Sequence, residues 1–166
     1  MKDIKTDSAK ILIIGIGNTG RGDDGLGWNF ADLVKDLGHE WLDVEYRYQL
    51  QIEDSSLVGK YGTVIFADAT QSPLENGFSV KACIPATHYF FSSHLQSPET
   101  ILYLASELFS QGPSAFAVAI SGNYWELKSG LTDTAEKNLR QAFGFFARNF
   151  LPTIQPWAGA HLISAQ

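Results

Sequence analysis

The chain has 166 residues, of which 45% are hydrophobic and 18% are charged, and these values are typical of one folded domain with a substantial core. The net charge of −6 and the lack of any Lys/Arg cluster argue against nucleic acid or an anionic membrane surface as a partner. The single cysteine, Cys83, excludes a disulfide within the chain and a zinc site made of several thiolates. No apolar run approaches the roughly 20 residues that span a bilayer, and residues 1–10 do not resemble a signal peptide, so a cytoplasmic location is expected.

The first predicted element is a strand over residues 10–17 (KILIIGIG), a continuous apolar run that indicates burial on both faces. A helix follows and ends near Gly38, and its apolar face consists of Leu26, Phe30, Leu33, Val34 and Leu37. Residues 41–49 alternate apolar and polar side chains, which predicts a half-exposed strand. Residues 62–69 (GTVIFADA) predict a second buried strand that runs into Asp68.

Residues 78–84 show the weaker alternation of another strand, which is followed by a helix with a clear start signal. Ser97 supplies a capping hydroxyl, and Pro98 fits the first helical position. The helical spacing of apolar residues continues until Gly112-Pro113, where the helix is expected to stop.

The last predicted strand is the apolar run at residues 115–122, and the last helix is capped at Thr132-Asp133. The inner face of this helix is expected to hold Ala135, Leu139, Ala142, Phe143, Phe146 and Phe150. Alternating strands and helices predict one three-layer α/β domain over residues 1–150, with a mostly parallel sheet covered by helices on both faces. Residues 151–166 contain two prolines and no clear period, so they are expected to form a tail.

Three polar side chains are expected beyond the carboxyl ends of strands, where open α/β sheets bind their ligands. Asp24 lies on the loop after the first strand, Asp68 ends the buried strand, and His94 lies between the strand at 78–84 and the next helix. Two carboxylates and an imidazole are a plausible ligand set for a borderline divalent ion such as Ni²⁺ or Zn²⁺. His88 competes with His94 for the imidazole position.

Each candidate also has a purely structural interpretation. Asp23 or Asp24 could cap the first helix, and a lone histidine such as His94 is more often structural than a ligand. Asp68 is the strongest outlier, because an aspartate behind four apolar strand residues is costly to bury unless it is paired, hydrogen-bonded or metal-bound.

The loop at residues 15–27 (GIGNTGRGDDGLG) offers a second interpretation, because Gly15, Gly17 and Gly20 spell the G-x-G-x-x-G fingerprint of nucleotide-binding oxidoreductases. The fingerprint requires a helix that starts near its last glycines, yet further glycines postpone any helix here until about Asp24. Two carboxylates beside a pyrophosphate would repel it, by about 1 kcal/mol per pair of charges 4 Å apart even in water. The second strand also lacks an acid at its end that would hold a ribose.

This loop, followed by FADAT and then by SSHLQSPETIL, resembles the [NiFe]-hydrogenase maturation proteases, and SGLT at residues 129–132 is similar to the family's C-terminal pattern. The similarity runs in order from about residue 10 to 150. It implies a twisted sheet of about five strands and an endopeptidase that removes a short C-terminal extension from the nickel-loaded hydrogenase large-subunit precursor. The nickel is expected to arrive with this substrate, and no tightly bound metal of the chain's own is expected.

Matched motif by motif, the resemblance implies that Asp24, Asp68 and His94 are the catalytic residues and contact the nickel, while Gly17 and Asn18 shape the loop. The sequence has no H-E-x-x-H and no G-x-S-x-G motif, which argues against a zinc peptidase and a serine hydrolase. Hydrolysis by the metal and by a carboxylate base both stay open, with Asp68 the better placed base. The alternative from another class is a non-catalytic nickel-binding or chaperone module, which would bind the precursor and leave its C-terminus uncut.

Overall fold

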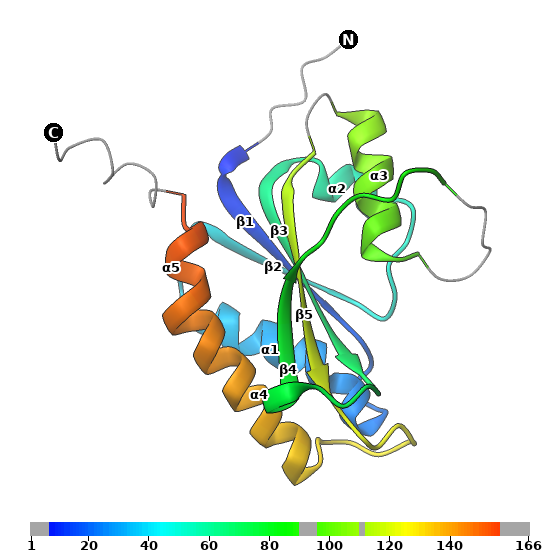
Figure 1. Cartoon of the computed structure of the whole chain (residues 1–166), viewed down its shortest axis with the longest axis vertical. Helices are drawn as coiled ribbons and strands as arrows, with labels where there is room; N and C mark the ends of the chain where they lie inside the picture. The colour runs from blue at the N-terminus through cyan, green and yellow to red at the C-terminus, as the bar shows by residue number, and fades with distance from the viewer. Residues whose placement is uncertain (1–6, 90–95, 110–111, 157–166) are drawn as a thin grey trace, which may run out of the picture.

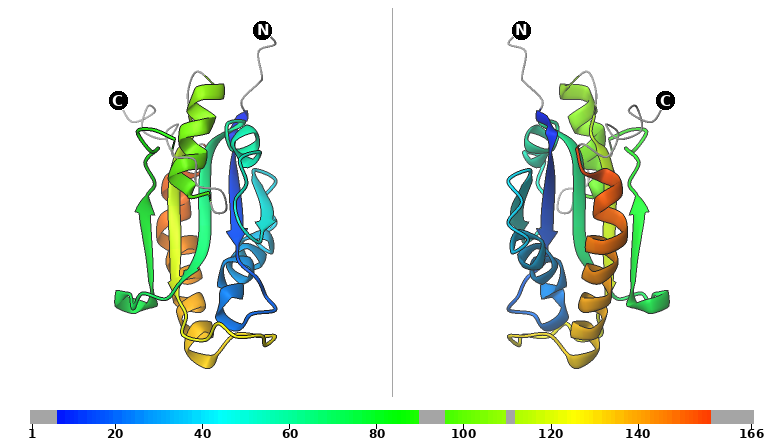
Figure 2. Two further views of the ribbon diagram at one scale, coloured as in Figure 1. Left: turned by 90° about the vertical axis from the view of Figure 1, so that its right-hand side faces the viewer. Right: turned by 90° about the vertical axis from the view of Figure 1, so that its left-hand side faces the viewer.

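The computed structural model describes residues 7–89, 96–109 and 112–156 of the chain, and it has a five-stranded sheet at its centre (Figure 1). The strands lie in the order β2-β1-β3-β5-β4, as Figure 2 shows with the strands side by side. Their bounds are β1 Asp7–Ile16, β2 Leu42–Arg47, β3 Tyr61–Thr70, β4 Phe78–Ala82 and β5 Ser114–Ser121. All five predicted strands are therefore present, and the mostly parallel α/β sheet is confirmed.

Helices cover both faces of this sheet, as the alternation of elements predicted. The α-helices are α1 Leu26–Lys35, α2 Asp54–Val58, α3 Pro98–Leu108, α4 Asp133–Phe145 and α5 Leu151–Ile154. Two short 3-10 helices are η1 Gly22–Gly25 and η2 Glu75–Gly77, and a π-helical turn, η3 Phe146–Phe150, joins α4 to α5. Helices α1 and α4 pack on one face, and α2 and α3 pack on the other.

The apolar run of β1 explains why helices are needed on both sides. Ile11 and Ile13 point into the core under α1 and α4, whereas Leu12 and Ile14 point into the core under α2 and α3. All four side chains are buried, and burial of each contributes about 1.5–3 kcal/mol relative to exposure. A strand segment without polar side chains, such as residues 11–16 of β1, is thus stable only in the interior of a three-layer domain.

The two caps predicted for later helices are confirmed. Ser97 Oγ accepts a hydrogen bond from the Thr100 backbone N–H at 3.2 Å, with Pro98 in the first turn of α3. Thr132 Oγ1 accepts one from the Ala135 N–H at 3.2 Å and so starts α4.

Helix α1 begins differently, because no side chain caps it and Gly25 precedes its first residue. Asp23 and Asp24 lie one turn earlier, in η1. The interpretation of either aspartate as the cap of this helix is therefore wrong.

Strand β4 runs antiparallel to β5 at the edge of the sheet. Its last residue, Ala82, pairs with Phe116 near the start of β5, and its first, Phe78, pairs with Ile120 near the end. The chain therefore leaves β4 at the end of the sheet where the parallel strands begin. This is opposite to the end where β1, β3 and β5 finish.

The C-terminal helix is longer than its apolar pattern predicted. It passes through the π-helical turn and continues as α5 as far as Ile154, with Leu151 buried in the core. Among the described residues, none of the helices has the length and hydrophobicity that a membrane span requires.

Candidate active site

The site lies where the order of successive strands in the sheet reverses. The chain moves from β1 outward to β2 and then returns across β1 to β3. Strands β1 and β3 are therefore neighbours, and the strands that follow each of them lie on opposite sides of this pair. Such a point leaves a crevice beyond the carboxyl ends of the two strands, where open α/β folds bind their ligands. Asp24 follows β1 and Asp68 lies near the end of β3, so both predicted carboxylates flank this point.

The glycine loop after β1 folds back on itself and presents Asp24. Gly17 has a φ of +138°, and a Cβ at this position would overlap the carbonyl oxygen of Asp24. The Asn18 N–H donates to that oxygen at 3.1 Å, and Asn18 Oδ1 accepts from the Gly20 N–H at 2.9 Å. Gly17 and Asn18 therefore shape the loop, as the resemblance implied.

Other hydrogen bonds of this loop disfavour a bound pyrophosphate. A dinucleotide loop must aim free N–H groups at the phosphates. Here the N–H of Gly17 donates to the Arg47 carbonyl at 2.9 Å, that of Arg21 to the Asn18 carbonyl at 3.0 Å, and that of Gly22 to the Lys128 carbonyl at 2.7 Å. These three donors are thus engaged within the protein, and Gly17 and Gly22, which both have a positive φ, serve the turn.

Asp23 is fully buried and does not face the crevice. Its Oδ2 accepts hydrogen bonds from the N–H groups of Asn123 (2.9 Å) and Tyr124 (3.1 Å) and from Thr132 Oγ1 (2.9 Å), while Oδ1 accepts from the Thr132 N–H (2.8 Å). Four donors replace the water that this carboxylate loses on burial. Asp23 thereby fastens the loop between β5 and α4 to the loop after β1.

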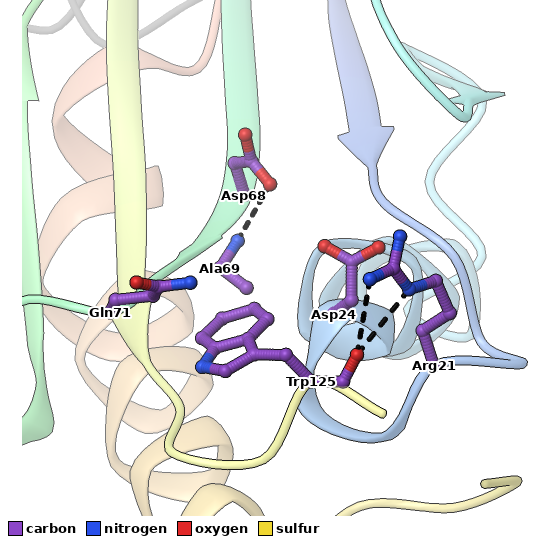
Figure 3. A pocket seen from close by; sticks show the side chains of 6 residues that line it. All are labelled: Arg21, Asp24, Asp68, Ala69, Gln71 and Trp125. Atoms are coloured by element: carbon purple, nitrogen blue, oxygen red, sulfur yellow. Dashed lines mark hydrogen bonds between the residues drawn. The ribbon is translucent and has the colours of Figure 1, made fainter. Parts of the chain in front are cut away.

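Asp24 and Asp68 line one cavity of about 320 Å³ (Figure 3). The other residues that line it are Arg21, Ala69, Gln71 and Trp125. The predicted convergence of the two carboxylates is therefore observed. The sequence offered no signal for Gln71 or Trp125, because their place at the cavity depends on how two distant loops fold over the sheet edge.

Asp68 retains its proton to an unusually high pH. Burial raises its pKa from 3.8 to about 7, and the negative charge of Asp24 adds to this rise. The Ala69 N–H, which donates to Asp68 Oδ1 at 2.8 Å, acts in the opposite direction. Two neighbouring carboxyls, one of them with a perturbed pKa, are typical of a functional cavity.

Arg21 places a positive charge beside Asp24. Its Nε and Nη2 groups donate to the Trp125 carbonyl oxygen at 3.4 and 3.3 Å, which holds the guanidinium next to the Asp24 carboxylate (Figure 3). Burial raises the pKa of Asp24, whereas the charge of Arg21 and the Asn18 N–H lower it. The two carboxyls of the cavity therefore have different surroundings.

The third predicted residue, His94, lies outside the described residues, and its role stays a prediction. The expectation that His94 lies beside the carboxylates assumed that the strand before it, β4, runs parallel to β1 and β3. Strand β4 is antiparallel, so this assumption does not hold. His88 is described and exposed, and one of its ring nitrogens lies 2.8 Å from Thr87 Oγ1. Within residues 7–89, 96–109 and 112–156, no group of three or more His, Cys, Asp or Glu side chains is arranged to hold a metal.

Cys83 has none of the properties of a nucleophile. The thiol is buried, and its Sγ lies 3.7 Å from Glu99 Oε1. Burial and the Glu99 carboxylate raise the pKa of this thiol to about 12, so the reactive thiolate is scarce at neutral pH.

No protein-family model matches the sequence, and no curated protein matches it. Solved structures do match the fold. The hydrogenase maturating endopeptidase HybD from E. coli is 18% identical, with a TM-score of 0.65 over 81% of this chain and 88% of that chain. The [NiFe] hydrogenase maturation protease HycI from Thermococcus kodakarensis KOD1 is also 18% identical, with a TM-score of 0.67 over 89% of this chain and 96% of that chain.

An uncharacterized protein from Wolinella succinogenes is 21% identical, with a TM-score of 0.56 over 84% of this chain and 94% of that chain. At these identities the similarity establishes a common fold. It is the fold that the resemblance in sequence implied, so the resemblance is confirmed at that level.

Proposed function

We propose that this chain is an endopeptidase that removes a short C-terminal extension from a nickel-loaded [NiFe]-hydrogenase large-subunit precursor. The observation that carries the proposal is the meeting of Asp24 and Asp68, from separate segments of the chain, in one cavity at the switch point of the sheet. The fold shared with hydrogenase maturation endopeptidases supports the same activity.

The nickel belongs to the substrate in this proposal. Carboxylate oxygens and an imidazole nitrogen suit a borderline divalent ion, so Asp24, Asp68 and His94 would complete the ligand set of the precursor's nickel. This contact would hold the peptide bond to be cleaved in a fixed position and so increase the rate of hydrolysis.

Hydrolysis requires a proton acceptor for the attacking water. We assign this role to the Asp68 oxygen that does not contact the nickel, because Asp68 is half-buried at the strand end and faces the same cavity as Asp24. The water loses a proton to Asp68 as its oxygen attacks the peptide carbonyl. The C–N bond then breaks, and the leaving amine takes up the proton. Polarisation of the carbonyl by the substrate's nickel is compatible with the same arrangement.

The test is to mix the purified nickel-loaded precursor with this protein and to follow its C-terminus by intact mass spectrometry. We expect the parent protein to remove the extension, and Asp24→Asn or Asp68→Asn to slow removal by about 10²-fold or more. Asp133→Asn, which changes an exposed acid at the start of α4, is the matched control and should cleave normally.

Two outcomes would overturn the proposal in different ways. A precursor that binds the parent protein but stays uncut indicates a nickel-binding or chaperone module. A folded Asp24→Asn, Asp68→Asn double variant that cleaves at the parent rate removes both carboxylates from the mechanism.

A further inference from the structure

A second cavity of about 600 Å³ adjoins the carboxylate cavity. It is lined by Arg21, Trp125, Glu126 and Leu127. Arg21 and Trp125 line both cavities, so the two spaces meet at these side chains. A chain bound over Asp24 and Asp68 therefore has a direct path into the second cavity.

The wall of the second cavity is a loop with a fixed position. Residues 122–132 connect β5 to α4, and the buried Asp23 carboxylate holds both ends of this loop through its four hydrogen bonds. Closer to the tip, the Lys128 carbonyl accepts from the Gly22 N–H at 2.7 Å, and the Lys128 N–H donates to the Gly20 carbonyl at 3.1 Å. The tip is thus arranged before any ligand binds, which lowers the entropic cost of binding.

The tip of this loop exposes an apolar side chain. Leu127 is 86% exposed, the highest value among the large apolar side chains of the described residues. A single exposed leucine is ordinary on a protein surface. This one lies on a hydrogen-bonded loop, beside Trp125 and at the mouth of a cavity that leads to the candidate site.

The cavity also offers a hydrogen-bond donor. Arg21 uses Nε and Nη2 on the Trp125 carbonyl, and its remaining terminal nitrogen points away from that oxygen (Figure 3). A guanidinium has donors only, so it suits a carbonyl or carboxylate oxygen. An apolar wall next to one directed donor matches an extended polypeptide, which has carbonyl oxygens along its backbone and side chains beside them.

We propose that the cavity of Arg21, Trp125, Glu126 and Leu127 binds the segment of the polypeptide substrate that adjoins the cleaved bond. An apolar side chain of that segment packs on Leu127 and Trp125, and a backbone carbonyl accepts from Arg21. The inference rests on the proposed peptidase function and adds to it the subsite that selects the sequence beside the bond.

The test compares Leu127→Gln with Ile84→Gln. Ile84 is also strongly exposed, at 74%, and follows β4 at the end of the sheet opposite to the candidate site. With the nickel-loaded precursor as substrate, we expect Leu127→Gln to raise KM about tenfold with kcat retained, because it removes binding common to the ground and transition states. Ile84→Gln should leave both constants within twofold of the parent values.

A substituted substrate sharpens the result. A second substrate has serine in place of the apolar residues beside the cleaved bond. With this substrate Leu127→Gln should cause no further rise in KM, because the effects of removing the two partners of one contact do not add. Equal KM values for the Leu127 and Ile84 variants on the original precursor would overturn the subsite and leave the peptidase proposal intact.

Equilibrium binding of the same precursor separates the two proposals. If the parent protein binds but does not cleave, the peptidase proposal fails, and the docking surface is judged by Kd alone. A Kd about tenfold weaker for Leu127→Gln than for Ile84→Gln supports the surface, and equal Kd values overturn it.

Discussion

Two adjacent aspartates in this chain have separate tasks. Asp23 is buried and accepts four hydrogen bonds from a loop about 100 residues away, whereas Asp24 faces the cavity beside Arg21. The residues lie in a 3-10 turn, in which successive side chains point in different directions. One carboxylate therefore serves the structure and the next remains available for a ligand.

We expect Asp23→Asn to destabilise the protein by about 2 kcal/mol or more, because an amide cannot accept all four hydrogen bonds of the carboxylate. In either orientation its NH₂ group faces an N–H donor. Urea unfolding gives the free energy, and hydrogen exchange should become faster at the amides of Asn123, Tyr124 and Thr132. The exposed Asp133→Asn should change stability by no more than about 0.5 kcal/mol. Unchanged exchange in the loop would contradict this role.

Asp68 should make stability depend on pH. Because its pKa is raised from 3.8 to about 7, the folded protein retains a proton that the unfolded chain releases near pH 4. Stability therefore falls as the pH rises from about 4 to about 7, and the loss persists above pH 7. The amide introduced by Asp68→Asn carries no charge at any of these pH values, so this variant is expected to be more stable than the parent by about 1–3 kcal/mol at pH 8.

Urea unfolding of the parent and Asp68→Asn at several pH values measures this effect. The difference in unfolding free energy should shrink as the pH falls and approach zero below about pH 3, where Asp68 is protonated in both the folded and the unfolded state. If the difference in unfolding free energy between the parent and Asp68→Asn does not change with pH, burial of the Asp68 charge is not its cause.

At the scale of elements, the packing of α1 on the sheet depends on a missing side chain. A Cβ at Gly27 would overlap the carbonyl oxygens of Ile16 and Ala67, so the first turn of α1 lies directly against the ends of β1 and β3. This close approach fixes the direction in which the preceding loop presents Asp24. The glycine at position 27 is therefore explained by close backbone contact.

Gly27→Ala sets two effects against each other. Alanine favours a helix over glycine by about 1 kcal/mol, while overpacking a buried contact costs about 1–3 kcal/mol or more. All three close contacts at this site are with backbone atoms, which cannot move aside as a flexible side chain can. We expect a net loss of about 2 kcal/mol, measured by urea unfolding followed by circular dichroism.

Gly112→Ala is the control for this change. A Cβ at Gly112 would find only an ordinary contact with Ser106, so its effect on the free energy of unfolding should stay within about 0.5 kcal/mol. Equal effects of the two substitutions would show that the close approach at Gly27 does not limit the packing of α1.

At the scale of the whole molecule, strand order determines which residues meet. β1 and β3 are neighbours, so the residues after their carboxyl ends lie close together, although 44 positions separate Asp24 from Asp68. Strand β4 is antiparallel to its neighbour, so the chain leaves it at the other end of the sheet, where the parallel strands begin. The direction of a strand thus decides at which end of the sheet the residue next to it lies.

The sequence alone determined the five strands and the three longest helices of this protein, α1, α3 and α4. Continuous apolar runs can be buried only between two layers of helices, so they predicted β1, β3 and β5 and the three-layer arrangement. Local chemistry also predicted the caps at Ser97 and Thr132 and the two carboxylates at strand ends, because each of these signals lies within a few residues.

The tertiary structure decided the direction of β4, the division of labour between Asp23 and Asp24, and the presence of Trp125 at the cavity. Each of these depends on contacts between segments far apart in the chain, whose free energy appears only when the sheet and its loops assemble. Amphipathic alternation is the same for a strand that runs up or down an edge, so no local pattern could have determined its direction.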